Sequence, residues 1–329
     1  MTEFNRRNFL KGALAAGAMT AAAGMIGCSP KSDNGTTAAS SAAEDFVQTA
    51  ETAGKKWSFE VAPDPIAEDK IVETVEADVI VVGCGTSGLM VANSAAEEGL
   101  KVVVVSASAA PVARGGSNNA TYCKAMEQAG VDRLSEFQIR KEIFYAGNQV
   151  DERKWYKHYN NSETAMNWVI DLMEAAGYKV KVEIGTPSED TDLYHETCSI
   201  GWDLGDGMQA DPDMQLATGM MQPLLVKELA RHLTEDLGGE IYFKTKGEQL
   251  VRDDGGAGRV SAVVCSREDG SYAKYVGKKA VVLATGDFSA NRDMMYAYAP
   301  SYAPYIADEI YDAETNYDVG FQYGGLFKG

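Results

Sequence analysis

The chain has 329 residues, and 45% of them are hydrophobic, so it is long and apolar enough to bury a substantial core. Its formal net charge of −18 at pH 7 argues against nucleic acid or an anionic membrane surface as a partner, because like charges repel. The five cysteines and three histidines show neither a C-x-x-C motif nor two ligands spaced for one helix face. The sequence therefore predicts no haem, iron–sulfur or other metal site.

The N-terminus has the pattern of an export signal. Arg6 and Arg7 precede an apolar, Ala- and Gly-rich stretch over 12–27, which is too short to form a stable membrane span. This combination is typical of twin-arginine signals, so we predict a signal peptide over 1–28 and export to the periplasm or the cell surface. Two processing sites stay open: an ordinary peptidase site at 21–23, and a lipoprotein-like site at which Cys28 would carry a lipid anchor.

Residues 29–74 are predicted to be a flexible linker. Its first part, 29–43, is rich in Ser, Thr, Ala and Gly and cannot bury a core. We therefore place one folded domain at 75–300 and assign 301–329 to the beginning of a further region.

The most informative motif is a strand that runs directly into G-x-G-x-x-G. The apolar residues 77–82 precede Gly83, Gly85 and Gly88, a helix of small residues follows, and a second strand is expected at 102–105. Gly83 permits the tight turn, Gly85 lets backbone N–H groups approach a pyrophosphate, and Gly88 lets the helix pack closely on the strand. The pattern predicts an α/β fold with a Rossmann-like dinucleotide-binding start.

The motif alone leaves the dinucleotide undecided. An acidic residue that accepts hydrogen bonds from ribose commonly follows the second strand, but here Ser106 stands at that position and offers a single hydroxyl. Both FAD and NAD(P) remain open on this evidence. Arg114 could meet a 2′-phosphate, a pyrophosphate or a flavin equally well.

Further elements follow in chain order. We expect a helix over 163–176 ending at Gly177, a long acidic loop over a binding face at 185–214, and a second helix over 223–237. Gly-rich turns then join short strands into a β-meander, at 241–243, 248–251, 259–265 and 272–276. A separate apolar strand leads to Ala284, Thr285 and Gly286, where the backbone could approach a ligand.

In this order, the glycine motif, the Gly115–Gly116–Ser117 segment, the meander and A-T-G-x-F at 284–288 resemble the flavoprotein subunits of the fumarate reductase and succinate dehydrogenase family, which includes urocanate reductases and ketosteroid dehydrogenases. The resemblance covers about residues 75–329. It implies that FAD is the cofactor, with the phosphates and flavin near the glycine motif and 115–117, and the adenine near Gly247. The cofactor-binding residues implied are Gly83, Gly85, Thr86, Ser87, Gly88, Ser106, Gly115, Gly116, Ser117, Gly247, Ala284, Thr285 and Gly286.

Two departures from the family pattern accompany the resemblance. Ser106 replaces the glutamate of the family, and Asn118–Asn119–Ala120 is followed by Thr-Tyr-Cys instead of a second Gly-Gly beside the flavin. Altered or looser flavin binding is the expected consequence.

The resemblance implies an exported FAD-dependent reductase of an activated C=C bond in a small unsaturated acid or enone. Flavin N5 would give hydride to one carbon and an arginine would protonate the other, with electrons from a quinol-linked or cytochrome donor. The alternatives are a ketosteroid-type dehydrogenase and a catalytically incomplete flavin-binding fragment. Because family members take their catalytic residues from a capping domain after A-T-G-x-F, we expect this domain to be largely missing and assign no catalytic residue.

Overall fold

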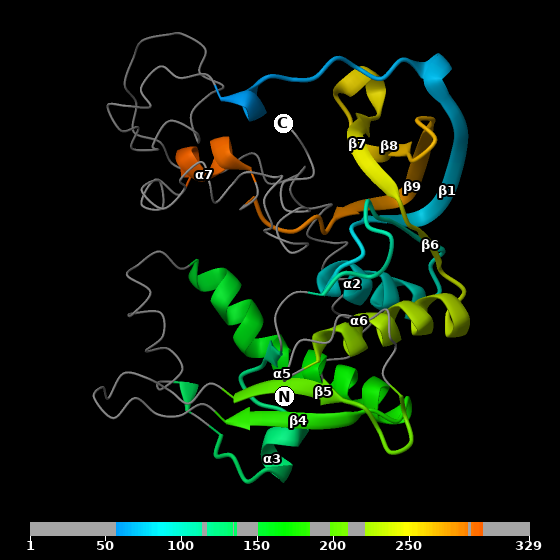
Figure 1. Ribbon diagram of the computed structural model, residues 1–329. Coiled ribbons are helices and arrows are strands. Elements are labelled where there is room, and N and C mark those ends of the chain that lie inside the picture. Colours follow the sequence, from blue (N-terminus) through cyan, green and yellow to red (C-terminus); the bar gives the residue numbers. More distant parts are fainter. Residues whose placement is uncertain are drawn as a thin grey trace, which may run out of the picture. The chain divides into compact units, whose positions relative to one another are not determined.

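The computed structural model describes residues 57–113, 117–133, 135–136, 151–184, 198–209, 221–288 and 291–298 (Figure 1). All of them belong to one compact unit, Trp57–Gly329. Several predicted features lie outside the described residues: the signal at 1–28 with Cys28, the linker as far as residue 56, Arg114, Gly115, Gly116 and the region 301–329.

A six-stranded sheet with the order β6-β2-β1-β9-β8-β7 carries the fold. Four strands pair in parallel across its first part: β6 (Glu240–Tyr242), β2 (Val102–Val105), β1 (Ile71–Val82) and β9 (Tyr272–Leu283). Two antiparallel strands complete it: β8 (Val260–Arg267) and β7 (Thr245–Arg252). The predicted α/β class, with a parallel dinucleotide-binding start and a β-meander, is confirmed.

The parallel strands are apolar on both faces because both faces are covered. Ile80 and Val103 lie in one hydrophobic cluster, and their neighbours Val81 and Val104 lie in another, all fully buried. Helix α2 (Thr86–Glu97) packs on β1 and β2 and contributes Leu89 to the second cluster. Sheets buried on both faces read as continuous runs of β-branched residues, as Val102–Val105 does.

Two strand predictions were wrong in their pairing. Residues 241–243, expected in the meander, contribute to β6, which pairs in parallel with β2. The strands expected at 272–276 and before Ala284 are one strand, β9, which pairs with β8 through its first half and with β1 along its whole length. The polar residues at 277–279 resemble a turn, but they form a bulge that keeps the strand continuous.

A second, antiparallel sheet has the order β3-β5-β4. Its strands are β3 (Asn118–Asn119), β5 (Cys198–Asp203) and β4 (Lys179–Ile184). The prediction of a long loop over 185–214 is therefore wrong at 198–203, which form β5. Ile200 and Trp202 of this strand are fully buried. The apolar core of this sheet is continuous with that of α2.

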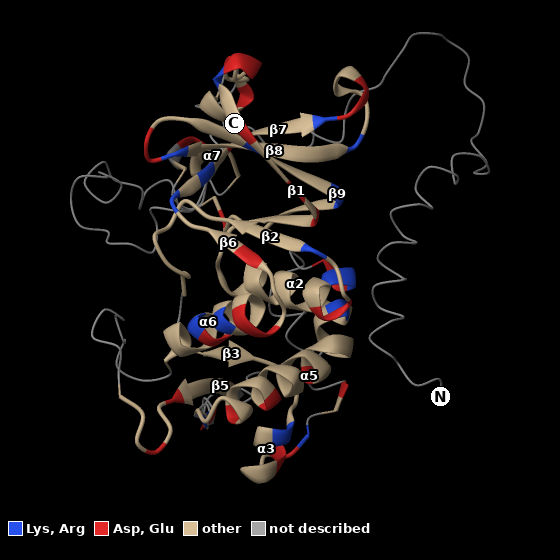
Figure 2. Cartoon of the chain, turned by 90° about the vertical axis from the view of Figure 1, so that its right-hand side faces the viewer, with Lys and Arg blue, Asp and Glu red and all other residues tan. Residues whose placement is uncertain are grey.

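Helices pack around the second sheet. They are α3 (Lys124–Gln128), α5 (Glu152–Ala175) and α6 (Gln222–Arg231), which a π-helical turn, His232–Asp236, continues. The predicted helix at 163–176 is the second half of α5, which begins earlier because the Asp151 side chain accepts a hydrogen bond from the Arg153 N–H. Helices α3 and α6 each carry positive and negative side chains (Figure 2), so neither helix presents a purely acidic surface.

The folded domain begins before its predicted boundary. A short 3₁₀ turn at Ser58–Glu60, a second at Glu68–Lys70 and the first residues of β1 lie within the segment 29–74 that was predicted as linker. The Ile66 N–H donates to Oε1 of Gln249 in β7 at 2.8 Å. At the other end, α7 (Arg292–Tyr298) follows the A-T-G-x-F segment. Within the described residues, no helix is both long and apolar enough to cross a bilayer.

Candidate functional site

Three segments meet at the carboxyl ends of the central parallel strands. The Gly83 N–H donates to the Val105 carbonyl at 2.8 Å, which joins the turn after β1 to the end of β2. The Ala284 N–H donates to the Val82 carbonyl at 2.8 Å, which joins the end of β9 to the same turn. In open α/β sheets, ligands bind in the crevice outside these strand ends. The structure thus brings together the predicted glycine motif and the predicted Ala284–Gly286 segment.

Two glycines of the motif are required by the protein's own packing. Gly83 has φ +112°, and a Cβ there would lie 2.2 Å from the Ala284 carbonyl oxygen. A Cβ on Gly88 would lie 2.0 Å from the Gly83 carbonyl oxygen. The roles predicted for these two residues, a tight turn and close packing of the helix, are confirmed.

Gly85 differs, because nothing in the described protein crowds it. A Cβ there would meet only the Val112 carbonyl oxygen at 3.7 Å, an ordinary contact, and its φ of −92° suits any residue. Gly85 is the N-cap of α2, and no side chain among the described residues caps this end. The N–H groups of the first helical turn have no partner within the helix, and they carry partial positive charge. This end can therefore receive an anion such as a pyrophosphate, with Gly85 leaving room for it.

The loop itself adds no negative charge to this position. Cys84 lies between the first two glycines of the motif and is buried. Burial raises the pKa of its thiol to about 12, so it stays neutral near pH 7. A neutral thiol does not repel a bound phosphate.

Ser106 directly follows β2 and is 7% exposed. The Ser108 hydroxyl donates to the Ala110 carbonyl at 2.7 Å, so the 2.7 Å contact between the two serine hydroxyls has Ser106 as donor. The single hydrogen of Ser106 is thus used within the protein. Toward a ribose hydroxyl, Ser106 can therefore act only as an acceptor. It has one oxygen for this, whereas a carboxylate has two.

The start of β7 lies beside Ser106. The Thr245 N–H donates to the Ser106 carbonyl at 2.8 Å, two residues before Gly247. A β-bulge follows, because Gly247 and Gln249 pair with consecutive residues of β8 and leave Glu248 as the extra residue. Bulges leave backbone groups unpaired and occur beside active sites. The ribose-side and adenine-side residues predicted from the resemblance are therefore neighbours.

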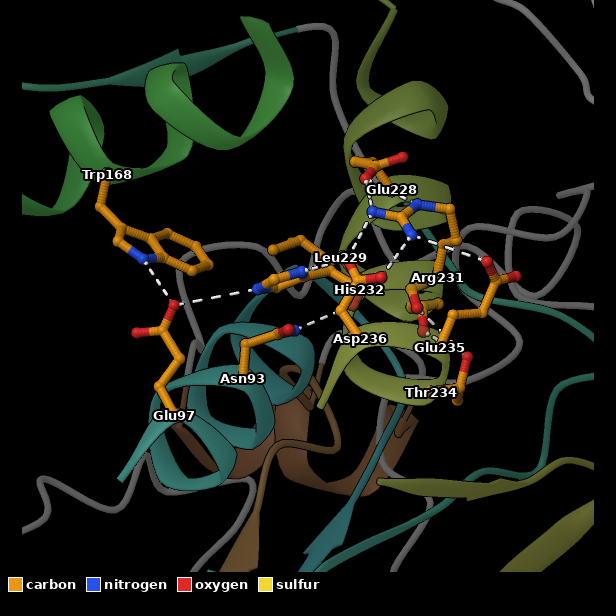
Figure 3. Close-up of polar contacts among 11 residues, drawn as sticks. Asn93, Glu97, Trp168, Glu228, Leu229, Arg231, His232, Thr234, Glu235 and Asp236 are labelled. Carbon is orange, nitrogen blue, oxygen red and sulfur yellow. Dashed lines mark hydrogen bonds and ion pairs between the residues drawn. The ribbon is translucent and has the colours of Figure 1, made fainter. Parts of the chain in front are cut away.

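Side-chain contacts with α5 and α6 hold helix α2 in place (Figure 3). The buried Asn93 donates through Nδ2 to the Leu89 carbonyl at 2.8 Å and to the Leu229 carbonyl of α6 at 2.9 Å. At the other end of α2, Glu97 accepts a hydrogen bond from Trp168 Nε1 at 3.0 Å. His232 lies next to this carboxylate and contacts Asp236 at 2.7 Å. The role of Asn93 was not predicted, although a polar residue inside the apolar stripe of a helix indicates a buried hydrogen bond.

The segment after residue 116 shows how the second family departure is accommodated. Ser117 leads into β3, and Asn118 forms a reciprocal amide pair with the buried Gln222 at the start of α6, at 3.1 and 2.8 Å. No local pattern in the sequence predicts this pair, because the two residues are far apart in the chain. Among the described residues, no group of three or more His, Cys, Asp or Glu side chains could hold a metal ion.

Comparison with known proteins identifies two matching families. The model of the FAD binding domain matches residues 78–308, and that of the twin-arginine translocation signal sequence matches residues 3–23. An NADH:fumarate oxidoreductase of Klebsiella pneumoniae is 25% identical over 224 residues, 68% of this chain and 22% of that protein. A vinyl phenol reductase of Lactiplantibacillus plantarum is 23% identical over 226 residues, 66% of this chain and 39% of that protein. The chain therefore spans well under half the length of these relatives.

Solved structures share the fold. A 3-ketosteroid-delta4-(5alpha)-dehydrogenase of Rhodococcus jostii matches with a TM-score of 0.57 and 23% identity, over 73% of this chain and 52% of that one. A flavocytochrome c3 fumarate reductase matches with a TM-score of 0.53 and 22% identity, over 75% of this chain and 41% of that one.

The two glycine roles can be separated by substitution. Gly88→Ala forces a methyl group onto the Gly83 carbonyl, so we expect a loss of about 3 kcal/mol in the free energy of unfolding. Gly85→Ala has room within the protein, so we expect a change within about 1 kcal/mol but a clear loss of FAD affinity. Denaturant unfolding and FAD titration of both variants measure this. Equal effects of the two variants on stability would contradict the distinction.

Ser106→Glu tests the ribose contact. A carboxylate can accept the Ser108 N–H with one oxygen and a ribose hydroxyl with the other, so FAD should bind about 1 kcal/mol more tightly. Ser106→Gln, which has the same length but no charge, is the matched control. Weaker binding by the glutamate variant than by the glutamine variant would show that the site is built around the serine.

Proposed function

Because the chain belongs to the FAD-binding domain family, we propose that it is the FAD-holding part of an exported oxidoreductase that reduces an activated C=C bond. The observation that carries this proposal is the start of α2 at the carboxyl ends of β1 and β9, where no side chain among the described residues caps the helix and Gly85 leaves room for an external group. The site fits FAD because a diphosphate needs backbone donors and partial positive charge.

We assign roles to this chain's residues as follows. The N–H groups of Thr86, Ser87 and Gly88 bind the pyrophosphate, and the Ser106 oxygen accepts from the ribose. Gly247 lies on the adenine side, and Ala284–Gly286 faces the cofactor with its backbone. Gly115, Gly116 and Ser117 are proposed for the phosphate and flavin side. When bound, FAD supplies the hydride-transferring centre.

The names of the two relatives support a proposal for the substrate class. Their names specify reduction of fumarate and of a vinyl phenol, and both compounds carry a C=C bond conjugated to a carboxyl group or an aromatic ring. We therefore propose a small unsaturated acid or enone as substrate, with an arginine outside the described residues as proton donor. A 3-ketosteroid is the second substrate to test, because the fold is shared with a ketosteroid dehydrogenase.

Export across the cytoplasmic membrane limits which electron donors the protein can meet. The twin-arginine signal directs the chain across the cytoplasmic membrane. One relative is named for NADH, but NADH is a cytoplasmic reductant, so we propose a quinol-linked or cytochrome donor for this chain. Cys28 is the proposed point of lipid attachment, and residues 301–329 the proposed beginning of a capping region.

Cofactor and substrate can be tested on the protein purified from its own cell envelope. We expect denaturation to release noncovalent FAD in about equimolar amount, and the dithionite-reduced flavin to be reoxidised without oxygen by one of fumarate, a vinyl phenol or a 3-ketosteroid that carries a conjugated C=C bond. Bound NADP in place of FAD would contradict the cofactor assignment. A flavin that only oxygen reoxidises would contradict the proposed reaction.

The export route has its own test. Replacing both Arg6 and Arg7 with lysine keeps the positive charge but removes the guanidinium pair, so the precursor should stay in the cytoplasm. Fractionation and immunoblotting measure this, with Lys11→Arg as a charge-neutral control that should be exported normally. Normal export of the double-lysine variant would show that another route is used.

A further inference from the structure

An aromatic cluster joins the beginning of the described chain to its end. We call residues 57–60 the N-terminal strap. Within it, the Trp57 and Phe59 rings stack with centroids 6.3 Å apart, and Phe59 lies 5.4 Å from the ring of Tyr298 in α7. Tyr298 in turn contacts Phe288 edge-on at 5.8 Å. The strap therefore reaches a residue that lies two positions after Gly286.

Polar contacts fix the same arrangement. The Ser58 N–H donates to Oδ2 of Asp293 in α7 at 3.0 Å. The Asn291 N–H donates to the Phe288 carbonyl at 2.8 Å, and its side chain accepts from the Met294 N–H at 3.0 Å, which caps α7. Hydrogen bonds through Asn291 thus connect Phe288 to α7, and the strap is attached to α7.

Gly286 lies in the segment between Phe288 and the strand ends, where the backbone can change direction. Gly286 has φ +89°, and a Cβ there would meet no described atom within 4 Å. Beyond it, Phe288 is 36% exposed. A glycine in an open position is a backbone pivot. The direction in which the chain leaves Ala284 therefore depends on contacts made further along, at Phe288 and Tyr298.

We propose that the strap is a positioning element of the FAD site: Phe59 holds Tyr298 and Phe288, and thereby holds Ala284–Gly286 in the conformation that faces the cofactor. The proposal rests on the assignment of that segment to the cofactor site. None of the strap residues needs to touch FAD. If the strap favours the binding conformation, FAD must stabilise the strap by the same factor.

The test compares three variants of the full chain. Phe59→Ala removes the ring, Phe59→Tyr keeps it, and Val61→Ala is the control, because Val61 follows the strap and is 50% exposed. We expect Phe59→Ala to raise the Kd for FAD about fivefold, the effect of losing one aromatic pair. Phe59→Tyr and Val61→Ala should stay near wild type. The apo melting temperature shows whether each variant folds, and Tyr298→Leu replaces Phe59→Ala if that variant does not.

Hydrogen–deuterium exchange supplies a readout that a purely structural role would not move. In the wild type, FAD should slow the exchange of a peptide covering 57–61, and this effect should disappear in Phe59→Ala. Unchanged FAD affinity in Phe59→Ala, or strap exchange that FAD does not alter in the wild type, would overturn the proposal. A wild-type chain that binds no FAD at all would instead overturn the cofactor assignment on which it rests.

Discussion

The close approach of three backbones at the ends of β1 and β9 is the constraint on which the rest of the structure depends. Gly83 lies against the Ala284 carbonyl and Gly88 lies against the Gly83 carbonyl, at distances that leave no room for a Cβ. Because of this contact, α2 begins at the strand ends, where no side chain among the described residues caps it. The same contact fixes Ala284, the first residue of the A-T-G-x-F segment, so the two candidate cofactor segments meet at this point.

The remaining features hold this arrangement in place. Asn93 donates to the Leu89 carbonyl of its own helix and to the Leu229 carbonyl of α6, and the second hydrogen bond ties α2 to α6 inside the apolar core. The Ser106 and Ser108 hydroxyls fix the chain after β2, and the N-terminal strap contacts α7. Contacts from outside the glycine motif therefore help to hold the candidate site.

Distance along the chain explains which parts of the fold and the candidate site the sequence could predict. The strand, the glycine loop and α2 are adjacent in the chain, so the period and spacing of residues 77–105 identify them. Partners that are distant in the chain leave no such local signal. Residues 241–243 read as a strand, but nothing local indicates that they pair with β2, and Gly277 reads as a turn although the bulge keeps β9 continuous. The hydroxyl chain from Ser106 and the pair of Asn118 with Gln222 depend likewise on tertiary contacts.

Backbone amide NMR signals during titration show whether the start of α2 receives the cofactor diphosphate. FAD should shift the Thr86, Ser87 and Gly88 signals strongly downfield, because charge-assisted hydrogen bonds form there. Inorganic pyrophosphate should shift the same signals more weakly. FAD binding that leaves these three signals unchanged while others move would contradict the account.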